Sequence, residues 1–188
     1  MEEVWLSRLH SNFPAAHPHS QEKSKSWSEE EKERIFEVLS NLPDTLTSNK
    51  TEAFVRAVRS TVPENPATWD NGFIILYDQA FDRKQNLGRI IAHEMAHQLF
   101  ADFSEETRTE YRWAANWLAK DKRRTEFFGR ADGYVQDDGR ASPEEDFANN
   151  VEYLLFDEPT LLKTTPQAHR WLKSYFGDNF KLKKGVRQ

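Results

Sequence analysis

The sequence predicts an α+β fold that is mostly helical, with a small sheet preceding a central helix. Two observations carry this prediction. Several segments repeat apolar residues every three to four positions, as amphipathic helices do, while the run FIILY at residues 73–77 is β-branched and aromatic and favours a strand. The chain has 188 residues, which is enough for one domain and short for two.

The N-terminal part divides into an arm and a first helix. Residues 1–26 show little periodicity and are predicted to be a loosely packed arm, and residues 27–188 to be the domain proper. Ser28 and Glu31 have the spacing of a capping box, which predicts a helix that runs up to Pro43. Four apolar side chains are available to anchor the arm to the domain: Trp5, Leu6, Leu9 and Phe13.

The middle of the chain supplies the small sheet and the central helix. Residues 54–62 are a short run with three Val, so a strand is favoured over a helix there. Pro and Gly residues then mark turns before the FIILY strand. An apolar stripe over residues 84–103 predicts the central helix, and Ser104 is expected to cap another helix that extends to residue 120. The second of these helices is predicted to bury Tyr111, Ala114, Ala115 and Leu118.

The last third of the chain is predicted to hold a loop and two helices. Residues 121–141 are polar and contain Gly, as loops do. Ser142 followed by Pro143 is a strong start signal for a helix, which we expect to continue to residue 156. A final helix over residues 167–176 precedes a Gly.

Composition excludes several classes of protein. The net charge is −5 and shows no basic excess, which argues against a nucleic-acid-binding surface. No apolar run approaches the roughly 20 residues needed to span a membrane, and the N-terminus has no apolar segment of the kind found in signal peptides. Because the chain has no Cys, any metal ion must be held by His, Asp or Glu.

The sequence HEMAH at residues 93–97 is the motif that indicates a chemical function. It lies in a segment that periodicity independently predicts to be helical, and four residues advance a helix by about 400°, so His93 and His97 share one face. This spacing suits two ligands of one zinc ion. Glu94 is offset by about 100°, beside the metal but not bound to it, where it can act as the general base. An accidental motif in a helical interaction domain is the rival interpretation.

A catalytic zinc ion needs a third protein ligand and an open position for water. Asp102 follows His97 by five residues and points about 140° away from it, so it is excluded. The helix that begins at Ser142 carries three candidates: Glu144, Glu145 and Glu152. Ser142 and Glu145 also have capping-box spacing, which explains Glu145 without a metal. Spacing alone leaves all three carboxylates open.

The motif and a second segment together resemble a known family. HEMAH is followed about fifty residues later by PEEDFANNVEYLL, and this pair is similar to the gluzincin zinc metallopeptidases of the anthrax lethal factor type, which include the Pro-Pro endopeptidases. The resemblance runs from about residue 43 to the last helix. It implies a zincin-like fold, one Zn²⁺ ion with Glu145 as the third ligand, and a secreted or periplasmic protein.

Two positions depart from that family. Asn149 stands where the family usually has a second Glu that supports the site, and Asp138 stands where it usually has a Tyr that stabilises the oxyanion. Tyr134 in the same loop is the suggested substitute, and His169 is another candidate donor.

The functional hypothesis is a zinc-dependent endopeptidase that hydrolyses peptide bonds through a zinc-bound water activated by Glu94. The FIILY strand is expected to be the sheet edge along which an extended peptide or protein substrate lies. The expected form is a monomer. The alternative is a catalytically weak or inactive zinc-stabilised module that binds peptides, which the departures at Asp138 and Asn149 favour.

Overall fold

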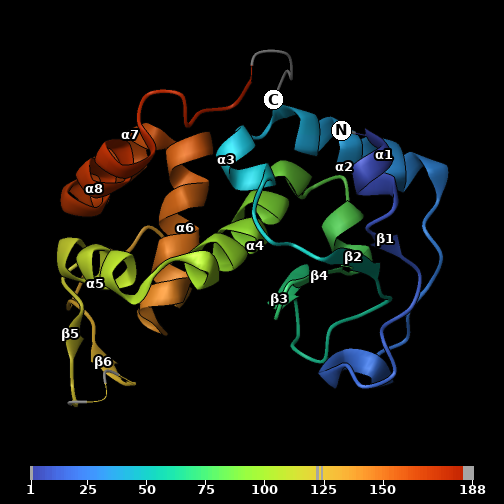
Figure 1. The fold of residues 1–188 in the computed structure, drawn as a ribbon, viewed down its shortest axis with the longest axis horizontal. Coiled ribbons are helices and arrows are strands. Elements are labelled where there is room, and N and C mark those ends of the chain that lie inside the picture. Colours follow the sequence, from blue (N-terminus) through green and yellow to red (C-terminus); the bar gives the residue numbers. More distant parts are fainter. Residues whose placement is uncertain (1, 122, 124, 184–188) are drawn as a thin grey trace.

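The computed structural model describes residues 2–121, 123 and 125–183, so residues 184–188 of the predicted domain lie outside it (Figure 1). Helices predominate, and a four-stranded sheet stands beside them. The α-helices are α1 (Glu2–Leu6), α2 (Glu29–Asn41), α3 (Asp44–Thr47), α4 (Leu87–Asp102), α5 (Glu105–Ala114), α6 (Pro143–Phe156), α7 (Glu158–Thr164) and α8 (Pro166–Phe176). The 3₁₀ helices are η1 (Pro18–Gln21), η2 (Asp78–Phe81) and η3 (Asp137–Arg140). The strands are β1 (Leu9–His10), β2 (Ala53–Arg56), β3 (Ala67–Asp70), β4 (Phe73–Leu76), β5 (Leu118–Ala119) and β6 (Phe127–Phe128). The fold is therefore mixed α/β, as the sequence predicts.

The main sheet has the strand order β1-β2-β4-β3. β2 is parallel to both β1 and β4, and β3 is antiparallel to β4. The FIILY strand, β4, is therefore an interior strand, and the expectation that it forms the sheet edge is wrong. Its run of Ile74, Ile75 and Leu76 is fully buried, which is the pattern of a strand covered on both faces. The edge strand beside the central helix is β3. This strand was not predicted, because it lies among turn residues in the sequence.

The N-terminal segment packs more closely than the loosely packed arm that the sequence suggests. Trp5 is only 4% exposed and meets Phe54 edge to face, and β1 extends the sheet next to β2. Leu9 and Phe13 also pack on buried residues, whereas Leu6 is exposed and anchors nothing. The segment therefore completes one side of the sheet.

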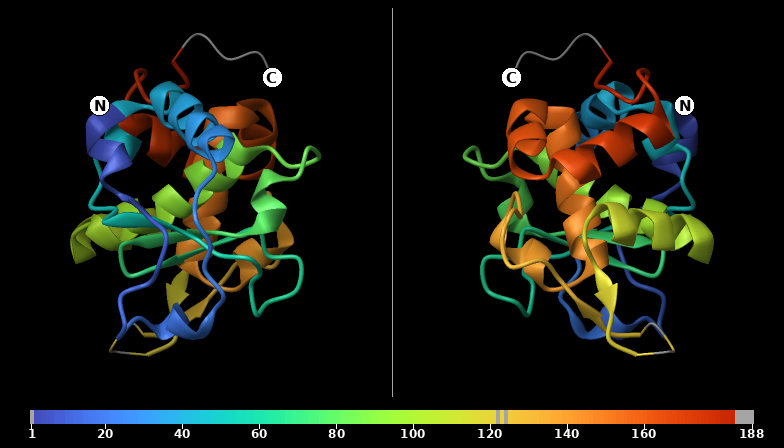
Figure 2. Two further views of the ribbon diagram at one scale, coloured as in Figure 1. Left: turned by 90° about the vertical axis from the view of Figure 1, so that its right-hand side faces the viewer. Right: turned by 90° about the vertical axis from the view of Figure 1, so that its left-hand side faces the viewer.

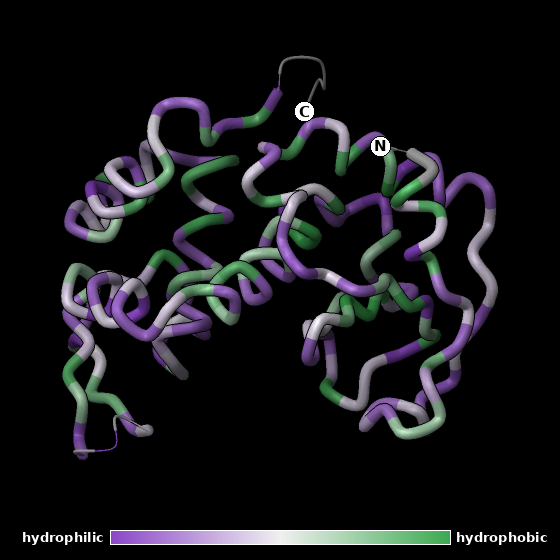
Figure 3. Tube along the Cα trace, viewed as in Figure 1, coloured by the Kyte–Doolittle hydropathy of each residue, from purple (hydrophilic) through white to green (hydrophobic). Residues whose placement is uncertain are grey.

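Helices α4 and α6 cross in the middle of the molecule (Figure 1). The side chain of Asn86 caps α4. Ser142 caps α6 with Pro143 in its first turn, as predicted. The most hydrophobic stretches of the chain gather at this crossing and on β4 (Figure 3). Phe100 of α4 and Phe147 of α6 pack with ring centroids 5.1 Å apart. This crossing brings the motif helix against the helix that carries the candidate third ligands.

Two boundaries and one helix differ from the predictions. β2 ends at Arg56; beyond it the N–H of Val58 donates to Lys23 and its carbonyl accepts from Asp78, and Val62 is exposed. The helix capped by Ser104 ends at Ala114, because Asn116 adopts a positive φ of 59°. Helix α7, which Asp157 caps, was not predicted.

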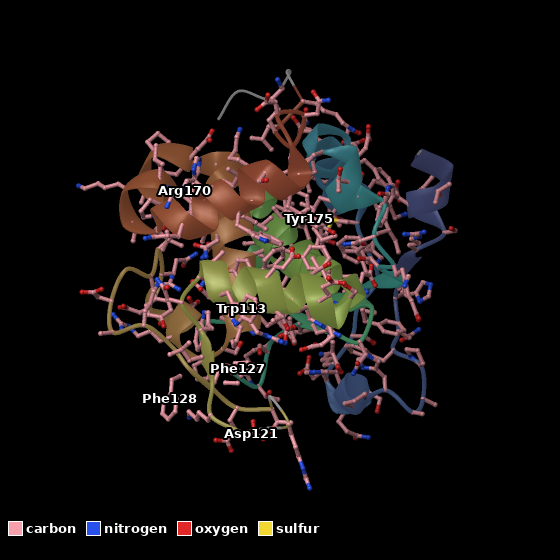
Figure 4. All side chains as sticks on the ribbon, turned by 60° about the vertical axis from the view of Figure 1, so that its left-hand side comes forward. Trp113, Asp121, Phe127, Phe128, Arg170 and Tyr175 are labelled. Carbon is pink, nitrogen blue, oxygen red and sulfur yellow. The ribbon has the colours of Figure 1, made fainter. Side chains whose placement is uncertain are left out.

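The end of α5 leads into a hairpin, β5–β6, that extends from the body (Figure 2). Leu118 and Phe128 pair across it and are exposed, so the prediction that Leu118 is buried is wrong. Phe127 turns inward beneath the guanidinium of Arg112, and Trp113 on α5 is also exposed (Figure 4). Among the described residues, no helix has the length and apolar character needed to cross a membrane.

Candidate metal centre

The two histidines of the motif face each other from consecutive turns of α4. Their Nε2 atoms are 3.1 Å apart, and the rings are nearly perpendicular at 76°. Trp69 of β3 stacks on the ring of His97 with centroids 5.9 Å apart. The carbonyl of Met95, between them, accepts a hydrogen bond from the amide of Asn49. The motif helix is thus held by the sheet edge on one side and by the loop before β2 on the other.

Glu145 of α6 completes the cluster. Its Oε1 lies 3.1 Å from Nε2 of His93, and its Oε2 lies 3.5 Å from Nε2 of His97. The backbone N–H of Glu145 donates to Oγ of Ser142. In α2 the same Ser-x-x-Glu spacing forms the full reciprocal capping box between Ser28 and Glu31. The Glu145 side chain is directed to the histidines instead.

The geometry of the three side chains fits a divalent cation. One ligand atom from each of His93, His97 and Glu145 lies within 4.8 Å of the others. Zinc distances of about 2.0–2.1 Å at a tetrahedral angle separate two ligand atoms by about 3.3–3.5 Å, which is close to the spacing seen here. Two imidazole nitrogens and one carboxylate oxygen are also a donor set that zinc accepts. Asp102, which the sequence analysis excluded as a metal ligand, accepts hydrogen bonds from Lys50 and Gln98.

The charges of the cluster are strongly coupled. Burial by itself lowers the pKa of His93, but its contacts with Glu145 and Glu152 outweigh burial and raise that pKa to about 10. Burial by itself raises the pKa of Glu145, but the hydrogen bond to His93 and the nearby His97 bring it below its ordinary value. The cluster is a place where positive charge is stabilised.

Glu94 lies next to the candidate ligands and takes no part in the cluster. Its side chain is buried, and burial raises the pKa of its carboxyl group, although both histidines act in the opposite direction. The backbone N–H of Trp69 donates to this carboxylate. Glu94, both histidines and Glu145 line one cleft of about 640 Å³, whose walls are β3, α4, η3 and the start of α6.

The other two acidic candidates lie on the far side of the histidine rings. Glu152 is 3.5 Å from Nδ1 of His93, and Glu144 is 3.4 Å from Nδ1 of His97. The structure therefore brings Glu145, and not Glu144 or Glu152, to the Nε2 atoms.

The two suggested oxyanion donors do not reach the cleft. The hydroxyl of Tyr134 donates to the carbonyl of Arg130, and its ring lies under that guanidinium, outside the lining of the cleft. The structure therefore does not bring Tyr134 to the cleft, because the loop turns its ring toward Trp117. His169 pairs with Glu158 at 2.8 Å and also lies outside the lining.

The two positions that depart from the resembled family contact each other. The amide of Asn149 donates to Asp138 at 2.7 Å, and its carbonyl accepts from Gln136 at 3.1 Å. Gln136 and Arg89 also line the cleft, and no motif in the sequence points to either.

No protein-family model, curated protein or solved structure matches this chain.

Proposed function

We propose that this protein is a zinc-dependent endopeptidase with a zincin-like fold, of the gluzincin type that its motifs resemble. The observation that carries the proposal is the triangle of His93, His97 and Glu145, with the buried Glu94 beside it in one cleft. The three ligands of the triangle would hold one Zn²⁺ ion. When bound, zinc supplies a lowered pKa for water, toward about 7, and polarises the substrate carbonyl.

Glu94 is the proton carrier in this scheme. Its raised pKa and buried position suit a carboxylate that takes a proton from the attacking water and returns it to the leaving amine. The N–H of Trp69 and the fixed position on α4 orient the carboxylate. General acid–base groups of this kind contribute about 10²–10⁴-fold to rate.

The edge strand β3 favours an extended peptide as the substrate. The carbonyl of Pro66 accepts from the N–H of Tyr77, so the hydrogen-bonded pairs with β4 fall at residues 66, 68 and 70. The backbone groups of Ala67 and Trp69 therefore face away from β4, and both residues line the cleft. A peptide laid along this edge would pair through main-chain hydrogen bonds with the carbonyls of Ala67 and Trp69, because the N–H of Ala67 already donates to Oδ1 of Asn65 and that of Trp69 to Glu94. We propose a monomer acting on a peptide or protein.

The second candidate function is a zinc-stabilised module that binds peptides with little or no cleavage. One observation favours it: among the described residues, no tyrosine hydroxyl lines the cleft. Cleavage of a diverse peptide library separates the two functions, because only the endopeptidase releases new N-termini.

The first prediction tests the proposed function directly. Elemental analysis should find one zinc ion per wild-type chain, and Glu145→Ala should lose it, because two imidazoles alone hold zinc weakly. Glu94→Gln should keep the zinc ion and lower peptide turnover at least about 100-fold, since the amide cannot take the proton. A wild-type protein that takes up no zinc, or a Glu94→Gln variant that cleaves at the wild-type rate, would contradict the proposal.

A further inference from the structure

Each imidazole of the candidate centre has a carboxylate at both of its nitrogens. The Nε2 atoms face Glu145, as described above. On the opposite side of the rings, Oε2 of Glu152 is 3.5 Å from Nδ1 of His93, and Oε1 of Glu144 is 3.4 Å from Nδ1 of His97. All three carboxylates come from α6, so one helix supplies both sides of the cluster.

Glu152 is held firmly in this position. Its side chain is 9% exposed, its Oε1 accepts from Nε of Arg89 at 2.6 Å, and its Oε2 accepts from the amide of Gln136 at 3.2 Å. The guanidinium of Arg89 itself lies over the ring of Tyr153, 4.7 Å from its centroid. A buried carboxylate is costly unless it is paired, and these partners from α4 and the loop before η3 fix where its charge sits.

Glu144 is held much less firmly. Its side chain is 39% exposed, and its carboxylate pairs with His97. Glu144 lies 3.4 Å from the buried Nδ1 of His97 and Glu152 lies 3.5 Å from Nδ1 of His93, so the two carboxylates differ in how firmly they are held and not in their distance from the ring. The two histidines are therefore supported unequally.

A carboxylate at Nδ1 determines what Nε2 can do. A neutral imidazole carries one N–H, and a carboxylate near Nδ1 favours the tautomer with the proton there. The lone pair is then on Nε2, toward Glu145 and the place of the cation. Such partners also raise the basicity of the ligand and fix the orientation of its ring.

We propose that Glu152 is a positioning residue that acts on the metal through Nδ1 of His93, and that Glu144 does the same for His97 with a smaller effect. This inference rests on the proposed function only in its first part, the binding of zinc, and does not require that peptides be cleaved.

The second prediction concerns zinc affinity, measured by competition with a chelating dye. Glu152→Leu should weaken binding of zinc about 10–100-fold, the usual cost of losing such a partner. Glu152→Gln keeps an oxygen that accepts from Nδ1–H and should lose less, and Glu144→Leu should also lose less than Glu152→Leu. The matched control is Glu158→Gln, which breaks a His–Glu pair outside the cleft and should leave the affinity unchanged.

A spectroscopic measurement separates positioning from the mere loss of a negative charge. In the zinc-loaded protein labelled with ¹⁵N, the Nδ1–H proton of His93 should resonate at low field, as expected for a proton shared with a carboxylate. It should move upfield in Glu152→Leu and much less in Glu152→Gln. If Glu152→Leu does not fold, Gln136→Leu, which removes one bond that holds Glu152, should show the same shift to a smaller degree.

The outcomes are distinguishable. Wild-type affinity in Glu152→Leu overturns the inference, and so do equal losses in the Leu and Gln variants with no change in the Nδ1–H signal. A graded loss of zinc affinity in a protein that cleaves no peptide supports the inference and removes the endopeptidase proposal. A wild-type protein without zinc overturns both.

Discussion

At the scale of single residues, identical local patterns serve different purposes. Glu31 and Glu145 each stand three residues after a Ser that caps a helix. Glu31 closes the capping box and also accepts from the buried guanidinium of Arg56. The side chain of Glu145 does not complete a capping box, because it contacts two histidines of another helix instead. The neighbours in space, and not the pattern, decide which interaction forms.

The third prediction uses the ion cluster around Arg56. Arg56 is fully buried and pairs with both Glu31 and Asp78. Burial by itself raises the pKa of each carboxyl group, but the bonds to Arg56, and for Asp78 also to Lys25, lower the pKa of both. A lowered folded-state pKa means that the stabilisation is present above the unfolded pKa and is lost as the pH falls through the folded one.

We therefore expect Glu31→Gln to lower the free energy of unfolding by about 1–3 kcal/mol at pH 7, and by less at pH 3. Urea denaturation between these pH values measures the difference. Glu29→Gln is the control on the same helical turn, since Glu29 is exposed and should change stability by less than about 0.5 kcal/mol. An equal loss at both pH values would show that the charge of Glu31 is not what stabilises Arg56.

At the scale of elements, the start of α6 sets the geometry of the centre. Ser142 fixes the first turn, so that Glu145 stands at the third helical position and Glu152 two turns further on the same face. A helix that began one residue later would rotate both carboxylates by about 100°. The cap is therefore a condition for the cluster of His93, His97 and Glu145 as well as for the helix.

The fourth prediction compares two helix caps. Ser142→Ala and Ser104→Ala should each cost about 1 kcal/mol of stability, because each hydroxyl accepts from a backbone N–H of the first turn. Only Ser142→Ala should also weaken zinc binding, by several-fold, since Glu145 is in that turn. Thermal melts and zinc titrations of both variants make the comparison. Equal weakening of zinc binding by the two variants would mean that general destabilisation is responsible.

At the scale of the whole molecule, the N-terminal segment completes the sheet against which the motif helix packs. β1 pairs with β2, β2 with β4 and β4 with the edge strand β3, whose Trp69 stacks on His97. β1 thus belongs to the same sheet as β3, which forms one wall of the cleft.

The fifth prediction tests whether this segment is integral to the domain. Trp5→Ala should lower the free energy of unfolding by about 3–5 kcal/mol, the usual cost of truncating a large buried aromatic side chain. Leu6→Ala, at the exposed neighbouring position, should cost less than about 1 kcal/mol. Chemical denaturation of both variants is the measurement. A cost for Trp5→Ala as small as that for Leu6→Ala would show that the segment is a detachable arm.

Features that depend on local interactions could be predicted from the amino-acid sequence. The start of α2 at its capping box, the start of α6 at Ser142-Pro143 and the end of α8 at Gly177 depend on hydrogen bonds and backbone angles within a few residues. The spacing of His93 and His97 likewise follows from the pitch of a single helix.

Features that depend on segments far apart in the chain became evident from the three-dimensional arrangement of the helices and strands. Spacing left three candidates for the third ligand: Glu144, Glu145 and Glu152. The crossing of α4 and α6 places Glu145 at the Nε2 atoms of the histidines and the other two carboxylates at the Nδ1 atoms. The strand order makes β3, and not β4 as predicted, the edge of the sheet. The packing of its loop directs Tyr134 away from the cleft. These choices could not be made from the sequence, because the free energy that favours each comes from contacts with partners that no local pattern specifies.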